Sequence, residues 1–514
     1  MRKGTVRFLA VLAAALLLLG SYAGALACTG FYVGKQASAN GAVMLARTVD
    51  LHPLAAMFRV LVVDRVEDQP GRRHTGTQGF SWELPDTTYK YTSTPMATGM
   101  GFGRYGSACM NEMGLAITGT VTAYARREIR AMDPAVEGGL CEEVLPELIA
   151  ASCATAREGV ALIGKIMAEL GSSEQNIIML ADADEAWYVE TYTGHQWAAV
   201  RMPEDRVAVY GNQFMLRYLD PEAEGVLHSP GLFTVPEEAG LAVYGEDGRM
   251  DLFRTYAGNL SDYGNRRTWI GHRVLAPSTA GEYDGSTRYD LFYAPDKKVS
   301  VNDLMALTRN RFEGTAFSPD ETGRGDLRVI GTESQGTAHI LQVFDDLPAA
   351  MRAVGWLCLA NAEHSVYLPV SSLITDTAES FRRDSQERSY QPEMASIAFK
   401  RLCALAEQDR AYYGAGVRNY WQGMEDKLLA EYPSVLTRAA GMYAASPEDA
   451  AEYLTEYTTG AQEKAFKDAN ALFEELLWYV MDHTDTLKYS FSYDTLTMGD
   501  TPTQAPFVPS LKLD

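Results

Sequence analysis

Hydrophobic and polar positions divide this chain into a strand-rich part and a helix-rich part. From about residue 29 to residue 360, short runs of β-branched and aromatic residues alternate with turn residues, which predicts strands. At 378–482 apolar residues recur at spacings of three and four, which predicts helices. Stretches 140–151 and 154–170 predict helices within the strand-rich part, where Pro146 either kinks the first or marks its true first turn. No strand–helix–strand alternation runs through the pattern, so it favours an α+β fold of two antiparallel sheets with helices outside.

The same pattern gives the expected domain boundaries. Residues 28–375 are expected to form one domain, and residues 376–490 a helical region packed on it. Residues 491–514, which contain Pro506 and Pro509, are expected to form an extended tail. No internal repeat or long linker interrupts this organisation.

The first 27 residues have the three parts of a secretory signal peptide. Basic residues come first, an apolar run follows at residues 8–19, and Ala25-Leu26-Ala27 supplies a small-residue cleavage motif. The apolar run is about a dozen residues long, which is shorter than the roughly 20 needed to span a bilayer as a helix. Residues 1–27 are therefore expected to be removed by signal peptidase. The mature chain is expected to be secreted or exposed at the cell envelope, without a stable membrane span.

Composition narrows the range of partners. The formal net charge is −22 at pH 7, and removal of Arg2, Lys3 and Arg7 would make it more negative. No basic surplus is left to neutralise phosphates, so nucleic acid is not an expected partner. No HxxxH or HExxH spacing occurs, so neither a metal nor another cofactor is expected. The oligomeric state is left open, a homo-oligomer included.

The chain has six cysteines, and the first of them stands directly after the cleavage motif. There is no CxxC pair. If Cys28 is reserved for chemistry, an odd number remains, which is awkward for an exported protein held together by disulfides. We interpret the set as one nucleophile and several buried thiols, with the pairing of Cys109 left open. The other cysteines are Cys109, Cys141, Cys153, Cys358 and Cys403.

Cleavage before Cys28 would give one residue both a thiol and a free α-amine, which is a nucleophile with its own base. Residues 37–41 contain an Asn-Gly turn signal between two predicted strands, so a hairpin should return residues 49–53 to positions opposite Cys28. Arg47 and Asp50 then lie near the new N-terminus. Arg47 is placed to favour the thiolate and Asp50 to orient the amine. In isolation, such a pair at a strand end is more often a surface ion pair.

Other candidates have simpler interpretations. Asn212 directly follows a predicted strand and is by default a turn residue. Arg266 and Arg267 belong to a basic and aromatic cluster that is by default a solvated edge. His52 is the histidine that the hairpin brings near Cys28, and a loop position is its simpler interpretation.

Several segments of the chain also resemble segments of a known protein family. They are Cys28-Thr29-Gly30, Ala46-Arg47-Thr48-Val49-Asp50, Met110-Asn111-Glu112-Met113-Gly114-Leu115, Arg266-Arg267-Thr268-Trp269, Leu275-Ala276-Pro277-Ser278, residues 331–356 and Ser365-Val366-Tyr367-Leu368-Pro369. Together they resemble the dipeptidase A and secernin-like cysteine peptidase family of N-terminal nucleophile (Ntn) hydrolases. Bile salt hydrolases and penicillin V acylases are more distant relatives. The resemblance implies a four-layer αββα sandwich with a helical C-terminal region, and hydrolysis of dipeptides through a thioester acyl-enzyme.

The resemblance also implies roles for individual residues. Cys28 would be the nucleophile and, through its amine, the base, with Arg47 and Asp50 beside it. Asn212 is similar to an oxyanion-side asparagine that follows a strand in the acylase relatives.

Three further residues also have counterparts in this resemblance. Arg267, or its neighbour Arg266, is similar to a later arginine that could bind a substrate carboxylate or support the thiolate. Thr120 stands where the acylase relatives carry an oxyanion-hole asparagine, and its hydroxyl could donate the same hydrogen bond.

Two other functions stay open. One is an amidase in the same fold that acts on N-acyl amino acids or bile-salt-like amides. The other is a lipid-anchored binding protein, because signal removal before a cysteine also creates lipoproteins whose thiol at Cys28 would be lipidated. Lipoprotein signals usually carry leucine three residues before the cysteine, whereas this chain has Ala25 there and Leu26 one place later. The side-chain preference of a dipeptide substrate is not indicated by the sequence.

Overall fold

The computed structural model of the chain describes residues 28–51, 57–101, 103–483, 490–492, 497–499 and 505–513. The expected signal peptide, residues 1–27, lies outside the described residues, and so does His52.

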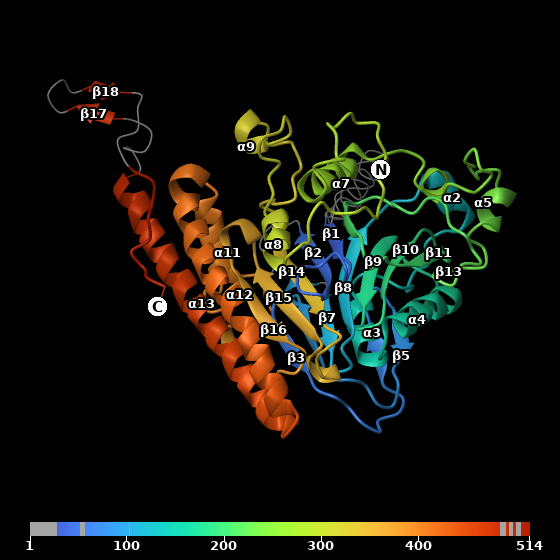
Figure 1. The fold of residues 1–514 in the computed structure, drawn as a ribbon, viewed down its shortest axis with the longest axis horizontal. Helices are drawn as coiled ribbons and strands as arrows, with labels where there is room; N and C mark the ends of the chain where they lie inside the picture. The colour runs from blue at the N-terminus through green and yellow to red at the C-terminus, as the bar shows by residue number, and fades with distance from the viewer. Residues whose placement is uncertain are drawn as a thin grey trace, which may run out of the picture.

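Two antiparallel sheets form the centre of the molecule (Figure 1). The first has six strands in the order β12-β1-β2-β14-β15-β16, and the second has eight in the order β13-β11-β10-β9-β8-β7-β6-β3. The predicted α+β class is thus confirmed. The strands of the first sheet are β1 (Thr29–Val33), β2 (Val43–Asp50), β12 (Val207–Tyr210), β14 (Gln335–Val343), β15 (Ala353–Leu359) and β16 (Tyr367–Ser371). Those of the second are β3 (Leu61–Val63), β6 (Tyr91–Pro95), β7 (Gly106–Asn111), β8 (Ala116–Thr122), β9 (Asn176–Ala181), β10 (Ala186–Thr191), β11 (Trp197–Arg201) and β13 (Val226–His228). Two small hairpins pair β4 (Arg73–Thr75) with β5 (Ser81–Glu83), and β17 (Ser490–Ser492) with β18 (Thr497–Gly499).

The two sheets face each other, with β2 and β14 of the first packed on β8 and β9 of the second. Strand β9 shows how the sequence produces this arrangement. Its side chains alternate between two faces, so Ile177 and Met179 join the core between the sheets while Ile178 and Leu180 join a second core. Both faces are apolar and buried, which is why this strand appears in the sequence as a continuous hydrophobic run.

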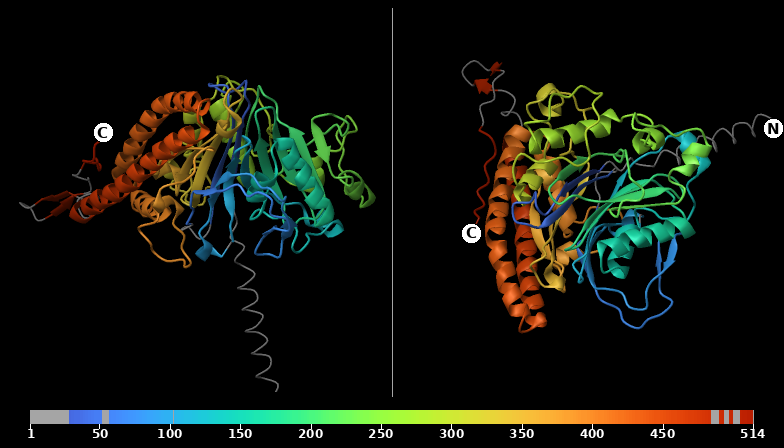
Figure 2. Two further views of the ribbon diagram at one scale, coloured as in Figure 1. Left: turned by 90° about the horizontal axis from the view of Figure 1, so that it is seen from below. Right: turned by 45° about the vertical axis from the view of Figure 1, so that its right-hand side comes forward.

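Helices cover the outer faces of both sheets (Figures 1 and 2). Helices α3 (Leu145–Ser152) and α4 (Ala156–Glu169) pack on the second sheet, and Pro146 lies in the first turn of α3, which settles the choice left open by the sequence. Helices α11 (Ala395–Ala406), α12 (Ala415–Tyr443) and α13 (Pro447–His483) pack against β15 and β16. Helix α7 (Asp262–Leu275) packs on β12, and α8 (Val301–Thr308) on β2 and β14. The short helices are α2 (Arg127–Met132), α5 (Thr234–Glu238), α6 (Leu252–Tyr256), α9 (Pro319–Thr322) and α10 (Glu379–Arg382).

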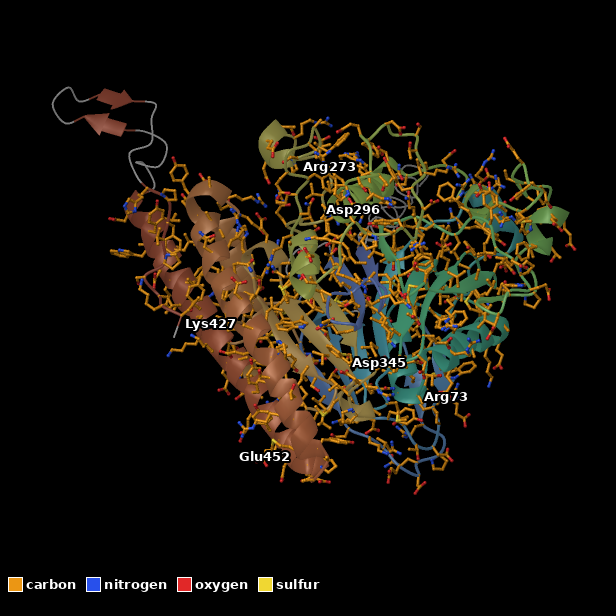
Figure 3. All side chains as sticks on the ribbon, in the orientation of Figure 1. Arg73, Arg273, Asp296, Asp345, Lys427 and Glu452 are labelled. Carbon is orange, nitrogen blue, oxygen red and sulfur yellow. The ribbon has the colours of Figure 1, made fainter. Side chains whose placement is uncertain are left out.

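Many charged side chains lie on the outside of these layers, as Arg73, Asp345 and Lys427 illustrate (Figure 3). Among the helices of the described residues, none is both long and apolar enough to cross a membrane. All six cysteines are buried and are free thiols. Packing and hydrogen bonding, rather than disulfides, therefore stabilise the described part of the fold.

Candidate active site

The predicted hairpin of β1 and β2 is present. Its register places Gly30 opposite Arg47 and Thr29 opposite Thr48, and Gly41 takes the left-handed conformation (φ 79°) that the turn requires. As a result Arg47 returns to Cys28, and its Nη2 donates a hydrogen bond to the Cys28 Sγ at 3.0 Å. The prediction that the hairpin brings these two side chains together is confirmed.

Arg47 is completely buried, so its interpretation as a surface residue is wrong. The same Nη2 forms an ion pair with Glu142 and donates to the Tyr105 hydroxyl at 3.0 Å. A buried guanidinium needs this compensation, because an unpaired charge inside a protein is costly. Sequence reasoning identified neither partner. Glu142 falls within the stretch predicted as a helix, but α3 begins only at Leu145.

Gly119 of β8 leaves the space that the Arg47 guanidinium occupies. A Cβ at this position would lie 2.3 Å from Arg47 Nη1 and 2.8 Å from the Ser107 carbonyl oxygen. Gly119→Ala is therefore expected to displace Arg47 and to slow any reaction at Cys28 roughly 10- to 100-fold, because small misplacements of groups at a reaction centre have effects of that size. Gly441→Ala in α12 is the matched control, since a Cβ at that position would have no atom within 4 Å. Steady-state kinetics that gave equal values for Gly119→Ala and the unchanged protein would contradict the prediction.

Helix α7 supplies a second buried arginine. Arg267 Nη1 donates to the Cys28 carbonyl oxygen at 2.6 Å and to Thr29 Oγ1 at 3.0 Å. Burial lowers the pKa of Arg267 to about 10, which still leaves it a cation at neutral pH. Arg266 points elsewhere, because it forms an ion pair with Asp262 and stacks over the Phe317 ring at 5.2 Å. Of the two neighbouring arginines, Arg267 is therefore the one that contacts Cys28.

The Asn212 side chain links Arg267 to the second sheet. Its Oδ1 accepts from Arg267 Nη2 at 2.8 Å, and its Nδ2 donates to the Thr122 carbonyl oxygen at 2.8 Å. Asn212 is thus more than a turn residue, because it accepts a hydrogen bond from Arg267, and Arg267 contacts Cys28. Thr120 lies in β8 beside Gly119, and its side chain lies outside what the structure describes.

A buried carboxylate anchors the chain that follows Asn212. Glu190 Oε1 accepts hydrogen bonds from the Tyr188 hydroxyl at 2.8 Å and from the backbone N–H groups of Met215 at 2.5 Å and Leu216 at 3.3 Å. Burial raises the pKa of Glu190 from 4.5 to about 7. The folded protein holds this proton to a higher pH than the unfolded chain does. The contribution of Glu190 to stability therefore falls as the pH rises through this interval.

Glu190→Gln is expected to remove this pH dependence. The amide keeps an oxygen for the two N–H groups but cannot ionise, so the variant should be more stable than the unchanged protein at pH 8, by at most about 3 kcal/mol. At pH 4 the two proteins should differ little. Denaturant titrations at both pH values measure the free energy of unfolding of each protein. If the variant and the unchanged protein differed by the same amount at pH 4 and pH 8, ionisation of Glu190 would not be the cause of the difference.

Asp50 ends β2 and is buried, with an ion pair between its Oδ2 and Nη2 of Arg328. Arg328 lies in a polar loop that the sequence did not single out. Burial lowers the pKa of Arg328 to about 10, and the nearby Cys28 acts in the opposite direction. Asp50 therefore lies in the same buried cluster as Cys28, as the hairpin predicts, with Arg328 as an additional member.

The charges around Cys28 do not cancel. Arg47 pairs with Glu142 and Arg328 pairs with Asp50, whereas Arg267 donates to neutral oxygens. Among the described groups this leaves one positive charge in excess, which favours an anion at the site.

The Cys28 thiol itself is fully buried, and burial raises its pKa above the usual value. Arg47 and Arg267 lower that pKa, as expected of nearby cations, and Glu142 raises it. Burial is the largest of these effects on the Cys28 pKa, so the thiol is protonated at neutral pH. Reaction at Cys28 therefore requires a base.

The clusters around His339 and His364, both in the described chain, do not have a reactive arrangement. His339 lies opposite Arg47 on β14 and contacts Thr118 Oγ1 at 2.8 Å, and burial and Arg47 hold its pKa well below the usual range. His364, Glu363 and Glu407 are close enough to hold a metal ion. However, Arg410 and Arg418 bind the Glu363 carboxylate at 3.0 Å each, which fits an ion-pair network better than a cation site.

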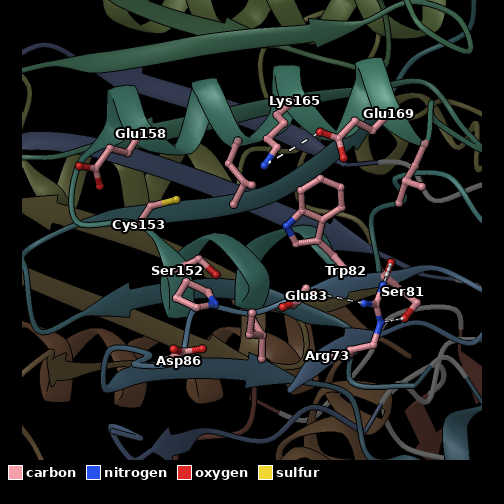
Figure 4. A pocket seen from close by; sticks show the side chains of 14 residues that line it. Arg73, Ser81, Trp82, Glu83, Asp86, Ser152, Cys153, Glu158, Lys165 and Glu169 are labelled. Carbon is pink, nitrogen blue, oxygen red and sulfur yellow. Dashed lines mark hydrogen bonds and ion pairs between the residues drawn. The ribbon is translucent and has the colours of Figure 1, made fainter. Parts of the chain in front are cut away.

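A separate cavity of about 790 Å³ opens between the β4–β5 hairpin and α4 (Figure 4). Lys165 lies over the Trp82 ring at 5.4 Å and forms an ion pair with Glu169 at 4.0 Å. The cavity contains a cysteine, Cys153, but burial raises the pKa of that thiol to about 12. Its thiol therefore stays protonated, and this cavity offers no activated nucleophile.

Comparison with known proteins adds three kinds of finding. The sequence model of peptidase family C69 matches residues 27–423. The "Probable dipeptidase B" of Streptococcus pyogenes serotype M1 is 32% identical over 469 residues, which cover 88% of this chain and 93% of that protein. The "Probable dipeptidase" of Salmonella dublin is 32% identical over 351 residues, or 67% of this chain and 80% of that protein. Among solved structures, a mutant conjugated bile acid hydrolase from Clostridium perfringens matches with 10% identity and a TM-score of 0.26, covering 67% of this chain and 92% of that one.

Proposed function

The chain belongs to peptidase family C69, and from this premise we propose that it is an exported cysteine dipeptidase whose nucleophile is Cys28. The observation that carries the proposal is the hydrogen bond from the buried Arg47 to the Cys28 Sγ, directly after the expected cleavage site. Two facing sheets with helices on both outer faces support assignment to the αββα sandwich of Ntn hydrolases. Dipeptidase names among the relatives favour dipeptides as substrates.

Cleavage after residue 27 supplies the missing base. It converts the amide nitrogen of Cys28 into an α-amine, whose unperturbed pKa is near 8. The excess positive charge around Cys28 disfavours an ammonium and favours a thiolate. The neutral amine can therefore take the proton from the thiol, directly or through a water molecule.

The reaction then follows from the positions of these groups. The thiolate sulfur bonds to the carbonyl carbon of the substrate, and the resulting oxyanion lies in a field of three arginines. As the C–N bond breaks, the α-ammonium returns its proton to the leaving amine. Water hydrolyses the thioester, with the amine again as base, and frees the thiol. Asn212 and Thr120 are the proposed oxyanion-side groups.

Purified protein that begins at Cys28 should be compared on three substrate sets: dipeptides, the corresponding tripeptides, and N-acyl amino acids. Free dipeptides are expected to give the highest kcat/KM, measured by release of amino acids. A clear preference for N-acyl amino acids or bile-salt-like amides would replace the dipeptidase proposal by the amidase alternative.

The lipid-anchored alternative is decided by the state of Cys28 in the exported protein. A free amine is expected, together with partition into the aqueous phase of a detergent extraction. Partition into the detergent phase, with the mass of a diacylglycerol on Cys28, would instead support a lipid-anchored protein.

A further inference from the structure

Arg328 connects separate parts of the chain at the end of β2. Its Nη2 forms the ion pair with Asp50, its Nε donates to the Tyr263 hydroxyl at 3.0 Å, and its Nη1 donates to the Val329 carbonyl oxygen at 2.7 Å. The Arg328 and Asp50 side chains are only 11% and 1% exposed. The first turn of α7 and the loop before β14 therefore hold the guanidinium, which in turn fixes one oxygen of Asp50.

The other oxygen of Asp50, Oδ1, is buried and has no hydrogen-bond partner among the described residues. Leaving a buried acceptor unpaired is unfavourable, so such an atom marks a place for a donor. Thr29 pairs with Thr48, and continuing this register puts Cys28 opposite Val49. Asp50 then lies one residue further along β2, on the side toward which the nitrogen of Cys28 points. Cleavage would turn that nitrogen into a group with up to three N–H donors.

On the basis of the proposed function, we propose that Arg328 is a positioning residue of the peptidase reaction. It holds Oδ2 of Asp50 so that Oδ1 is presented to the new amino terminus of Cys28. The amine is thereby oriented toward the thiol on the same residue.

Arg328 also balances the charge of Asp50. A bare carboxylate beside an amine would stabilise the ammonium and so remove the base. With Arg328 paired to it, the carboxylate can accept a hydrogen bond while its negative charge is compensated. The charged or titratable groups that surround Cys28 come from several elements. They are Arg47 and Asp50 from β2, Tyr105 before β7, Glu142 before α3, Tyr210 from β12, Tyr263 and Arg267 from α7, and Arg328.

Arg328→Ala tests this role. It is expected to lower kcat on a dipeptide roughly 10- to 100-fold and to move the acidic limb of the kcat/KM profile about one pH unit upward, because the ammonium is then stabilised. Arg328→Lys keeps the charge and should return the limb toward its original position. Arg324→Ala is the matched control, since Arg324 lies in the same loop and pairs with the exposed Asp326.

A rival role for Arg328 is binding of the substrate carboxylate, and a C-terminally amidated dipeptide separates the two. The positioning role predicts the same loss on the dipeptide and on its amide. A rise in KM confined to the free dipeptide, with no shift of the limb, would overturn the proposal, and so would unchanged kinetics.

Alkylation of Cys28 by iodoacetamide gives a second readout that does not depend on peptide hydrolysis. In Arg328→Ala its pH profile should also move upward, because a cation near the thiol has been lost. If the unchanged protein is alkylated normally but hydrolyses no dipeptide, the proposed function fails and the Arg328 assignment is judged by alkylation alone.

If Arg328→Ala does not fold, Tyr263→Phe is the second variant. It removes the hydroxyl that accepts from Arg328 Nε and should give a smaller loss of kcat. Full activity of Tyr263→Phe would contradict the inference.

Discussion

Replacing Cys28 with alanine is expected to reduce dipeptide hydrolysis by roughly four orders of magnitude or more, to the level of background. Loss of a catalytic nucleophile has effects of this size or greater in hydrolases that form an acyl-enzyme. The side chain is fully buried and accepts from Arg47, so the alanine variant keeps the surrounding ion pairs but has no atom that can form the thioester. Cys28→Ser should keep a trace of activity, because the amine can still take the proton of the hydroxyl.

Cys403→Ala is a matched control for this prediction. Cys403 is also a fully buried free thiol, but it lies in α11 and contacts the Asn361 carbonyl oxygen. The control should retain nearly all activity and lose only a little stability, as expected for a small cavity. If Cys28→Ala were as active as Cys403→Ala in a hydrolysis assay, Cys28 would not be the nucleophile.

Blocking removal of residues 1–27 is expected to have an effect almost as large. Signal peptidase requires small residues at the first and third positions before the cut, so Ala27→Tyr should leave the leader attached. The nitrogen of Cys28 then stays an amide, which cannot act as a base, while the thiol remains protonated by burial. Activity should be lost although the described fold is unchanged.

Leu26→Gln is the control for cleavage, because the middle position of the motif tolerates many side chains. It should be cut and active. Intact-protein mass spectrometry should find an unblocked Cys28 as the first residue of the control and the full leader in Ala27→Tyr. Hydrolysis by protein that still carries its leader would contradict the proposed role of the amine.

Short-range patterns made the first half of this site predictable. Arg47 lies 19 residues from Cys28, and the Asn40-Gly41 turn between two strands was enough to bring them together. The sequence also predicted a strand-rich part from residue 29 to residue 360, and strands β1 to β15 lie within it.

Long-range partners could not be predicted in the same way. Glu142 is 95 residues from Arg47, and Arg328 is 278 residues from Asp50. Their contacts depend on how two sheets and a long loop pack, and no local periodicity encodes that. Burial was misjudged for the same reason, because a charged residue at a strand end says nothing of the sheet that covers it.

The choice between Arg266 and Arg267 shows a further limit. Successive residues on a helix point about 100° apart, so only one of two neighbours can face Cys28. The pattern of the sequence placed both in a basic cluster, but the direction depends on how α7 packs on β12. Contacts with Cys28 and Thr29 then identify Arg267.

The hydrogen bond from Arg267 to the Cys28 carbonyl oxygen bears on whether the chain is inactive before cleavage. These contacts, like that of Arg47 with the thiol, exist while residues 1–27 are still joined to the chain. The precursor would thus be a zymogen whose catalytic groups are assembled in advance, and a single peptide bond would separate it from the mature enzyme. Activity should appear with the same time course as the new amino terminus, without a lag for refolding. Control over when this peptidase acts would then rest with the processing enzyme and not with a conformational change.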